Sequence, residues 1–275
     1  MAGLTNNSVA LARLDAAIGL SGLFLALAPT DASKDTGISR TIRQKWKNGQ
    51  VIIMGRLMGY FQQDILFALL ADAVDAGKAG DPDVLRTGER VSMGLAEQRE
   101  VISVHLGYPR LAELAGHKNS AKFRAGARDA VQMLAGVTVR GEGADESFAV
   151  QRLISGAAGA GRKGVNVTLN WRLTLAALGR GIYGAISLAE RRKLDKTARI
   201  AHAWLACWLG AKTRNSIGVS TLAGHIFPPS KKLSERTVRY RVSATRDALL
   251  AIGELDGWRI EVDEKDVARS ERLPE

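Results

Sequence analysis

The chain has little of what disulfide-bonded proteins need. Its 275 residues include one cysteine, Cys207, which excludes an internal disulfide. Cys207 lies between Trp204 and Trp208 on the apolar stripe of an expected helix, so we expect a buried, unreactive thiol. This cysteine usage fits the reducing cytoplasm.

Long apolar runs are also missing. The segment Ala16 to Ala28 resembles the apolar region of a signal peptide, but it is too short to span a bilayer. Arg13 before it is offset by Asp15, and Pro29 would follow the supposed cleavage site. We therefore expect a buried helix or strand here, and no membrane association.

The groupings that enzymes need are absent. The chain has four histidines, His105, His117, His202 and His225. Their spacing to one another and to Cys207 does not match that of metal ligands. No Ser, Cys or Thr lies in a recognisable nucleophile motif, and the carboxylates are too scattered to hold the Mg²⁺ of a nuclease or primase. The sequence therefore predicts no enzyme, no cofactor and no metal.

Acids are fewer than bases. Lys and Arg number 39 against 28 Asp and Glu, which gives a net charge of +11, while 46% hydrophobic residues suffice for a packed core. Such a folded, basic body suits a polyanionic partner. The length fits two domains, which we place at residues 1–181 and 182–263, followed by a charged, solvated tail at residues 264–275.

Two parts of the chain repeat one another. Residues 126–140 run from Arg128-Asp129-Ala130-Val131 through an Ala/Gly stretch to Val137-Thr138-Val139, and residues 244–262 run from Arg246-Asp247-Ala248-Leu249 to Trp258-Arg259-Ile260. Each copy predicts a basic helix, a glycine break and a strand, which is the order that ends a winged helix. We therefore predict an α+β, mainly helical fold with two winged-helix domains in tandem.

Before the first copy, alternation on both sides of an Asn-Gly turn predicts a hairpin over residues 42–56, and helical spacing predicts a helix over residues 61–74. A short helix over residues 108–115 then leads to a second over residues 120–134. The outer face of this second helix carries Arg124, Arg128 and Gln132 among small residues, which suits insertion into a DNA groove. An ordinary solvated helix face remains an equal alternative.

Three strands are expected after this helix, over residues 137–140, 148–154 and 165–171, as the first wing region. The glycine-rich segment 156–164 contains a literal G-x-G-x-x-G, but a strand rather than a helix follows it, so a nucleotide site is not expected. We interpret the segment as a flexible loop whose Arg162 and Lys163 are available to phosphates.

The second copy begins at a capping box formed by Ser187 and Glu190. A helix over residues 196–209, a short strand and a helix over residues 220–227 lead to a recognition helix that begins near Ser234. Its expected buried side consists of Val238, Val242, Thr245, Leu249 and Ile252.

The opposite side of that helix is predicted to bind DNA and consists of Arg236, Arg239, Tyr240, Ser243 and Arg246. An arginine fork can pair with guanine through two hydrogen bonds. Lys231 and Lys232, in the loop before the helix, are expected to contact phosphates.

Several stretches of the second copy resemble one known family. They are Ile186-Ser187-Leu188, Leu194 to Ala198, Cys207-Trp208-Leu209, Val219 to Pro228 and Thr237-Val238-Arg239. They resemble replication protein C, the iteron-binding initiators of IncQ-type plasmids. The resemblance is good from Tyr183 to Val262, whereas from Ile42 to Trp171 it lies more in the order of elements than in residues.

This resemblance implies a cytoplasmic bacterial protein with two winged-helix domains. It implies binding to double-stranded DNA at direct repeats of an origin, opening of nearby DNA, and loading of the plasmid's helicase and primase. It assigns no base contacts, so the residues above rest on the helix-face argument alone. A winged-helix transcriptional regulator is the alternative, although two heads without an evident ligand domain argue against it.

Overall fold

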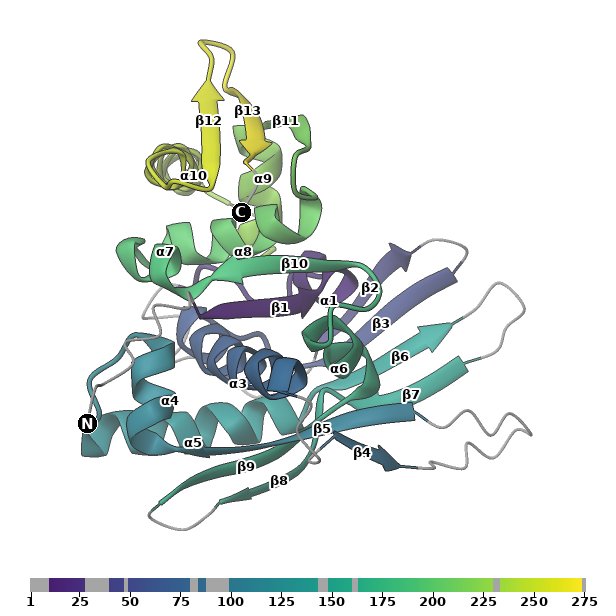
Figure 1. Cartoon of the computed structure of the whole chain (residues 1–275). Coiled ribbons are helices and arrows are strands. Elements are labelled where there is room, and N and C mark those ends of the chain that lie inside the picture. The colour runs from purple at the N-terminus through teal and green to yellow at the C-terminus, as the bar shows by residue number, and fades with distance from the viewer. Residues whose placement is uncertain are drawn as a thin grey trace.

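The computed structural model describes residues 10–27, 40–46, 49–79, 84–87, 99–142, 148–159, 163–229 and 233–273. Helices and antiparallel sheets alternate along the chain (Figure 1). The α+β class is thus confirmed, but the chain contains much more strand than a mainly helical fold would.

The helix α3 (Tyr60–Ala79) lies at the centre of the molecule. Every side chain from Ile65 to Ala71 is fully buried, which is expected only of a helix that is surrounded on all sides. The elements that surround α3 are β1 (Leu11–Asp15), β5 (Arg99–Gly107), α4 (Tyr108–Ala115), α5 (Ala121–Ala135), α6 (Trp171–Ala177) and α8 (Lys196–Trp208). The helix predicted over residues 61–74 is therefore confirmed, and it is longer than expected.

The strands β2 to β9 form two four-stranded sheets. The first has the order β2-β3-β6-β7 and comprises β2 (Arg40–Trp46), β3 (Gly49–Gly55), β6 (Thr138–Glu142) and β7 (Phe148–Arg152). The second has the order β4-β5-β9-β8 and comprises β4 (Val84–Thr87), β5, β9 (Gly164–Leu169) and β8 (Ile154–Gly159). The predicted hairpin at residues 42–56 is confirmed as β2 and β3, while its turn at residues 47–48 lies outside the described residues.

The predicted first wing region is wrong in its pairing. The strand expected over residues 148–154 divides at buried Leu153 into β7 and β8. The third strand, β9, pairs with β5 and β8 and does not join the hairpin β6–β7. Gly156 to Gly159, expected in a flexible loop, lie in β8, and residue 171 begins α6. Strand spacing alone could not reveal this partner, because β5 lies far away in the sequence.

The second unit follows at β10 (Tyr183–Ser187) and α7 (Leu188–Lys193), and continues through α8. The elements after α8 are β11 (Arg214–Gly218), α9 (Val219–Ile226), α10 (Glu235–Gly253), β12 (Trp258–Val262) and β13 (Val267–Arg272). The strands form a sheet of order β11-β13-β12.

The charged segment at residues 264–275 is not the solvated tail that we expected, because it contains β13. The buried Arg272 donates to the backbone oxygens of Ala185 at 2.6 Å and Ala206 at 3.3 Å, and its guanidinium lies over the Trp258 ring. Charge composition suggested a tail, but these partners turn the arginine inward.

The N-terminal segment connects the two units. As predicted, residues 16–28 contain a buried helix, α1 (Ala16–Leu20), and β1 before it pairs with β10 of the second unit. Cys207 is buried against Gly19 and Gly184, where an added Cβ would come within 2.2 and 2.7 Å of its Sγ. Burial, with the nearby Asp15 carboxylate, raises the pKa of this thiol to about 12. The division of the chain at residues 181 and 182 stays a prediction.

Half of the predicted capping box is present. The Ser187 Oγ accepts a hydrogen bond from the Glu190 backbone N–H at 3.3 Å. The Glu190 carboxylate does not return to Ser187 and accepts instead from the Gly257 N–H at 2.9 Å. Glu190 therefore attaches α7 to the turn before β12.

Candidate nucleic-acid interface

The helix α10 is packed against the core mainly through its C-terminal half. Its C-terminal half buries Thr245, Leu249 and Ile252 against α8, α9 and β12. Val242 is only partly buried, and Val238 is 44% exposed, which corrects the prediction that both belong to the buried side. The first turns of α10 therefore extend beyond the core that holds the rest of the helix.

Four of the five binding residues that were predicted on α10 lie toward its N-terminal end. Arg236, Arg239, Tyr240 and Ser243 are exposed, as the helix-face argument required. Arg239 donates to Glu235 at 3.2 Å, and the side chains of the two are 82% and 88% exposed. An exposed pair of this kind contributes little to stability, so a DNA phosphate or base could replace the glutamate.

Two other arginines of α10 form hydrogen bonds or ion pairs within the protein. Arg246 forms an ion pair with Asp266 at 3.1 Å and donates to the Asp263 carbonyl at 3.4 Å, both in the turn between β12 and β13. Arg241 donates to the Pro228 carbonyl at 2.7 Å. Arg246 thus occupies the predicted face but already contacts acids of the hairpin turn.

Helix-face reasoning missed Asp263 and Asp266, because they were assigned to the end of a domain and a solvated tail. The Asp263 carboxylate accepts from the N–H groups of Lys265 and Val267, at 2.9 and 3.0 Å, and these bonds hold its pKa below the ordinary value. The turn therefore carries fixed negative charge beside α10. The alternation of apolar and charged residues from Trp258 to Val262, followed by the polar run before Val267, was the signal that could have indicated a hairpin.

In the first copy, α5 presents a basic face over a buried one. Arg124, Arg128 and Gln132 are exposed, and the opposite side is buried from Phe123 to Leu134. The Arg124 Nε donates to the Asn119 side chain at 2.9 Å. The Ser120 side chain caps the helix by accepting from the Phe123 N–H at 3.1 Å.

The remaining predicted contacts lie in loops. Lys163 is exposed at the start of β9, and its carbonyl accepts from the Tyr108 N–H at 3.2 Å. Arg162, Lys231 and Lys232 lie outside the described residues.

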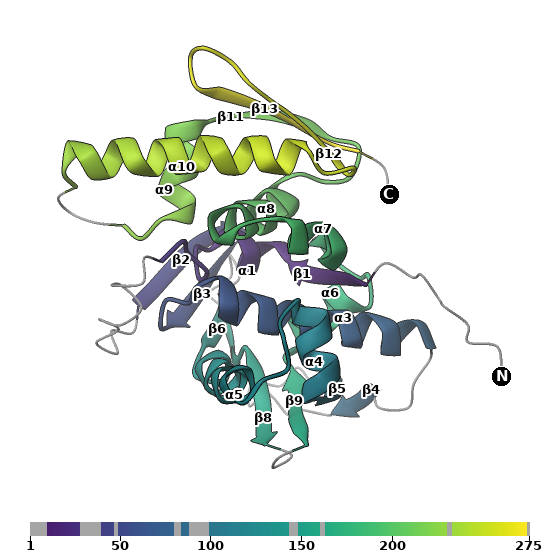
Figure 2. The ribbon, with the colours of Figure 1, turned by 90° about the vertical axis from the view of Figure 1, so that its left-hand side faces the viewer.

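The two basic helices do not lie side by side. Figure 1 shows α10 end-on and α5 lengthwise, and Figure 2, turned by 90°, shows the reverse. In both views α10 is at the top of the molecule and α5 at the bottom, with α3 and α8 between them. The helices therefore run crosswise at opposite ends of one body.

Within the described residues, no group of three or more His, Cys, Asp or Glu could hold a metal ion. The histidine in the second unit's core, His202, is 1% exposed, and burial together with repulsion by Arg191 and Arg272 lowers its pKa to about 3. No helix in the described part is both long and apolar enough to span a membrane.

Comparison with known proteins gives one family and one fold. The family model for replication protein C (RepC) matches residues 93–269. The crystal structure of selenomethionine derivatives of domains 2 and 3 of RctB aligns with 91% of this chain and 95% of that chain, at a TM-score of 0.53 and 13% identity. Another structure of RctB domains 2–3 aligns with 92% and 95%, at a TM-score of 0.49 and 12% identity. No curated protein matches the sequence significantly.

Proposed function

The chain belongs to the replication protein C family, and we propose that it is a plasmid replication initiator that binds double-stranded DNA through two winged-helix heads. We call α4, α5 and the hairpin β8–β9 the first head, and α9, α10 and the hairpin β12–β13 the second head. The family match includes α4, α5, α9, α10, the hairpin β8–β9 and most of the hairpin β12–β13.

The observation that carries the proposal is a repeated connectivity. In the second unit the order is α8, β11, α9, α10, β12 and β13, and β11 pairs with β13. In the first unit the order is α3, β4, β5, α4, α5 and then β6 to β9, and β5 pairs with β9 in the same antiparallel way. A winged helix has this order, with its last helix in the major groove and a hairpin behind it. Because β8 pairs with β9 as β12 pairs with β13, the strands β4, β6 and β7 are extra strands of the first copy on this interpretation.

The side chains favour DNA as the partner of both helices. Arg236 and Arg239 extend from the projecting end of α10, and Arg124 and Arg128 lie on the open face of α5. Guanidinium groups can pair with guanine or with phosphate, whereas Lys163 and the lysines before α10 suit phosphates alone.

Membership of the family supports a role in the initiation of replication. We propose that the sites are direct repeats, or iterons, at a plasmid origin, that binding opens nearby DNA, and that helicase and primase are loaded there in the bacterial cytoplasm. The protein acts by binding, and not as an enzyme. Where both heads occupy one site, we expect their half-sites to lie about one helical turn, or 10 to 10.5 base pairs, apart.

Selection of bound DNA from a random pool by the full chain tests the proposal. The selected sequence is then sought in the plasmid that encodes the chain, and the bound region is footprinted. Directly repeated copies near an origin are the expected result. A single palindrome at a promoter would identify a transcriptional regulator instead, and recovery of no preferred sequence would contradict sequence-specific binding.

A further inference from the structure

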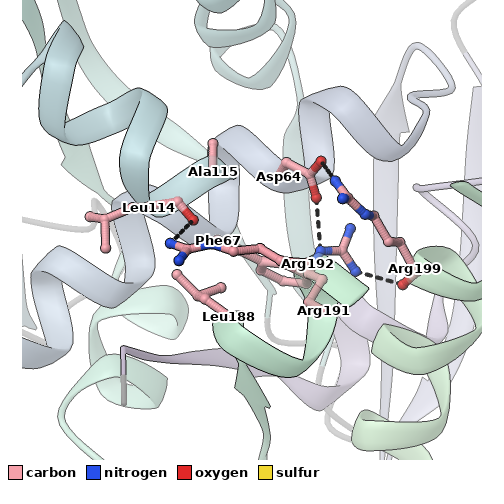
Figure 3. A pocket seen from close by; sticks show the side chains of 8 residues that line it. All are labelled: Asp64, Phe67, Leu114, Ala115, Leu188, Arg191, Arg192 and Arg199. Carbon is pink, nitrogen blue, oxygen red and sulfur yellow. Dashed lines mark hydrogen bonds and ion pairs between the residues drawn. The ribbon is translucent and has the colours of Figure 1, made fainter. Parts of the chain in front are cut away.

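The acid Asp64 lies inside the core at the junction of the two units (Figure 3). Its side chain is 2% exposed and accepts from Arg191 Nε at 2.8 Å and from Arg199 Nη1 at 2.7 Å. Arg191 also donates to the Gln63 side chain at 2.7 Å and to the Arg199 carbonyl at 2.5 Å. The carboxylate is therefore surrounded by directed hydrogen bonds.

The partners of Asp64 come from three different parts of the fold. Arg191 belongs to α7 and Arg199 to α8, both in the second unit. The third partner, His117, lies 3.2 Å away in the turn between α4 and α5, and its ring stacks on Phe123 of α5. Asp64 thus contacts the turn of the first head directly, and it contacts the helix α8 that packs against α10.

A neighbouring arginine strengthens the same junction. Arg192 of α7 donates to the carbonyls of Glu113 and Leu114 at the end of α4. Gly116, in the left-handed region at φ 71°, leaves room for it, because an added Cβ would lie 2.8 Å from the Arg192 Cγ. The two consecutive arginines of α7 therefore both attach the second unit to the first.

We propose that Asp64 is a positioning residue that fixes the two heads relative to each other and so sets the spacing of half-sites that one molecule recognises. Apolar surfaces alone can slide past one another, whereas buried ion pairs demand one geometry. The inference rests on the proposed function, since spacing matters only if both heads bind one DNA.

The carboxylate is charged near neutral pH. Burial alone would raise the pKa of Asp64, but attraction to Arg191, the hydrogen bond with His117 and attraction to Arg199 outweigh burial and lower the pKa below its ordinary value.

The first test measures the placement of the heads without DNA. Spin labels at Ala125→Cys on α5 and Ala251→Cys on α10, both exposed positions, report the distance between the helices in the full chain. The variant Asp64→Leu/Arg191→Met/Arg199→Met replaces the ion pairs by apolar groups, a change that often preserves folding. Arg110→Met removes a surface pair within α4 and is the matched control.

We expect one narrow distance distribution for the parent and for the control, and a broader or displaced one for the triple variant. A folded triple variant with the parent distribution overturns the proposal. If the triple variant does not fold, Arg199→Met takes its place. That change removes one of the hydrogen bonds to Asp64, and an unchanged distribution then overturns the proposal equally.

The second test uses the selected DNA site with one, two or three base pairs inserted between the regions that the heads protect. Linked binding contributes about 10²- to 10⁴-fold when both heads fit and nothing when they do not. Insertion should therefore weaken binding of the parent by about 100-fold and of the triple variant by less than about tenfold. Equal losses in both proteins would contradict the proposal. If the parent selects no DNA, the proposed function fails, while the label distances still decide the role of Asp64.

Discussion

The two heads differ most in how their second helices are held. Phe123, in the first turn of α5, is 5% exposed, whereas Val238, in the first turn of α10, is 44% exposed. The helix α5 is therefore packed from its beginning, whereas the first turn of α10 is exposed and the helix becomes buried only farther along. A projecting helix can enter a groove more deeply than one that lies flat on its own domain.

The hairpins behind the helices differ as well. In the second head, β12 and β13 complete a small three-stranded sheet, and the acids of their turn contact Arg246. In the first head, β9 pairs with β5 and β5 with β4, so the hairpin β8–β9 belongs to a four-stranded sheet. If both heads bind DNA as proposed, we expect the second head to supply most of the sequence specificity and the first head to orient the molecule on DNA.

The largest expected effect comes from the projecting end of α10. Arg236→Ala/Arg239→Ala should cost about 3 kcal/mol of binding to the selected site, since each lost arginine contact is worth about 1 to 3 kcal/mol. Equilibrium binding of the full chain measures this cost. Lys193→Ala, an exposed lysine of α7 that pairs with Asp256, is the control and should bind as the parent does. If this variant loses less binding free energy than Arg124→Ala/Arg128→Ala of α5, then the first head, and not the second, contributes more to binding.

Acid should destabilise the core of the second unit through His202. Its pKa is about 3 in the folded chain against an ordinary value of 6.5. Between these values the unfolded chain binds a proton that the folded chain does not, so stability falls as the pH falls below 6.5. From pH 6.5 to 5 the free energy of unfolding should decrease by about 2 kcal/mol from this group.

Urea unfolding at pH 7 and pH 5 measures the decrease. His202→Gln should remove this part of the pH dependence, and His105→Gln, an exposed histidine of β5, is the control. An identical pH dependence in the parent and in His202→Gln would show that the buried ring carries no such penalty.

Regular periodicity made much of the fold predictable. The apolar positions of α3, α5 and α8 and the alternation in β2 and β3 are local signals, and these elements lie where the sequence placed them. The exposed face of α5 was predictable for the same reason. The exposure of Val238 was not predictable, because helical spacing shows which face is apolar but not where along the helix the supporting core ends.

Long-range partners could not be predicted. The pairing of β5 with β9 and the contact of Asp64 with Arg191 join residues distant in sequence, and no local pattern marks them. Asp64, directly before the apolar run of α3, was the local sign of a buried ion pair, because a buried carboxylate needs a partner.

Removing the open face of α5 should have a moderate effect. Arg124→Ala/Arg128→Ala should weaken binding by about 1 to 2 kcal/mol and erase only part of the footprint, since the first head is expected to cover one half-site. Footprinting of the full chain checks this. Loss of the whole footprint would show that the first head is needed for all binding, and an unchanged footprint would remove α5 from the interface.

The smallest effect concerns the acidic turn of the second head. Asp266 neutralises Arg246 and adds negative charge beside the DNA face, so Asp266→Asn should strengthen binding to all DNA by about 0.5 kcal/mol. The slope of log affinity against log salt should steepen by about one, because one more cation becomes available to phosphates. Glu271→Gln, which removes an acid on the face of β13 paired with Arg259, is the control. If Asp266→Asn instead weakens only the specific site, then Asp266 orients Arg246 toward a base, and the hairpin takes part in recognition.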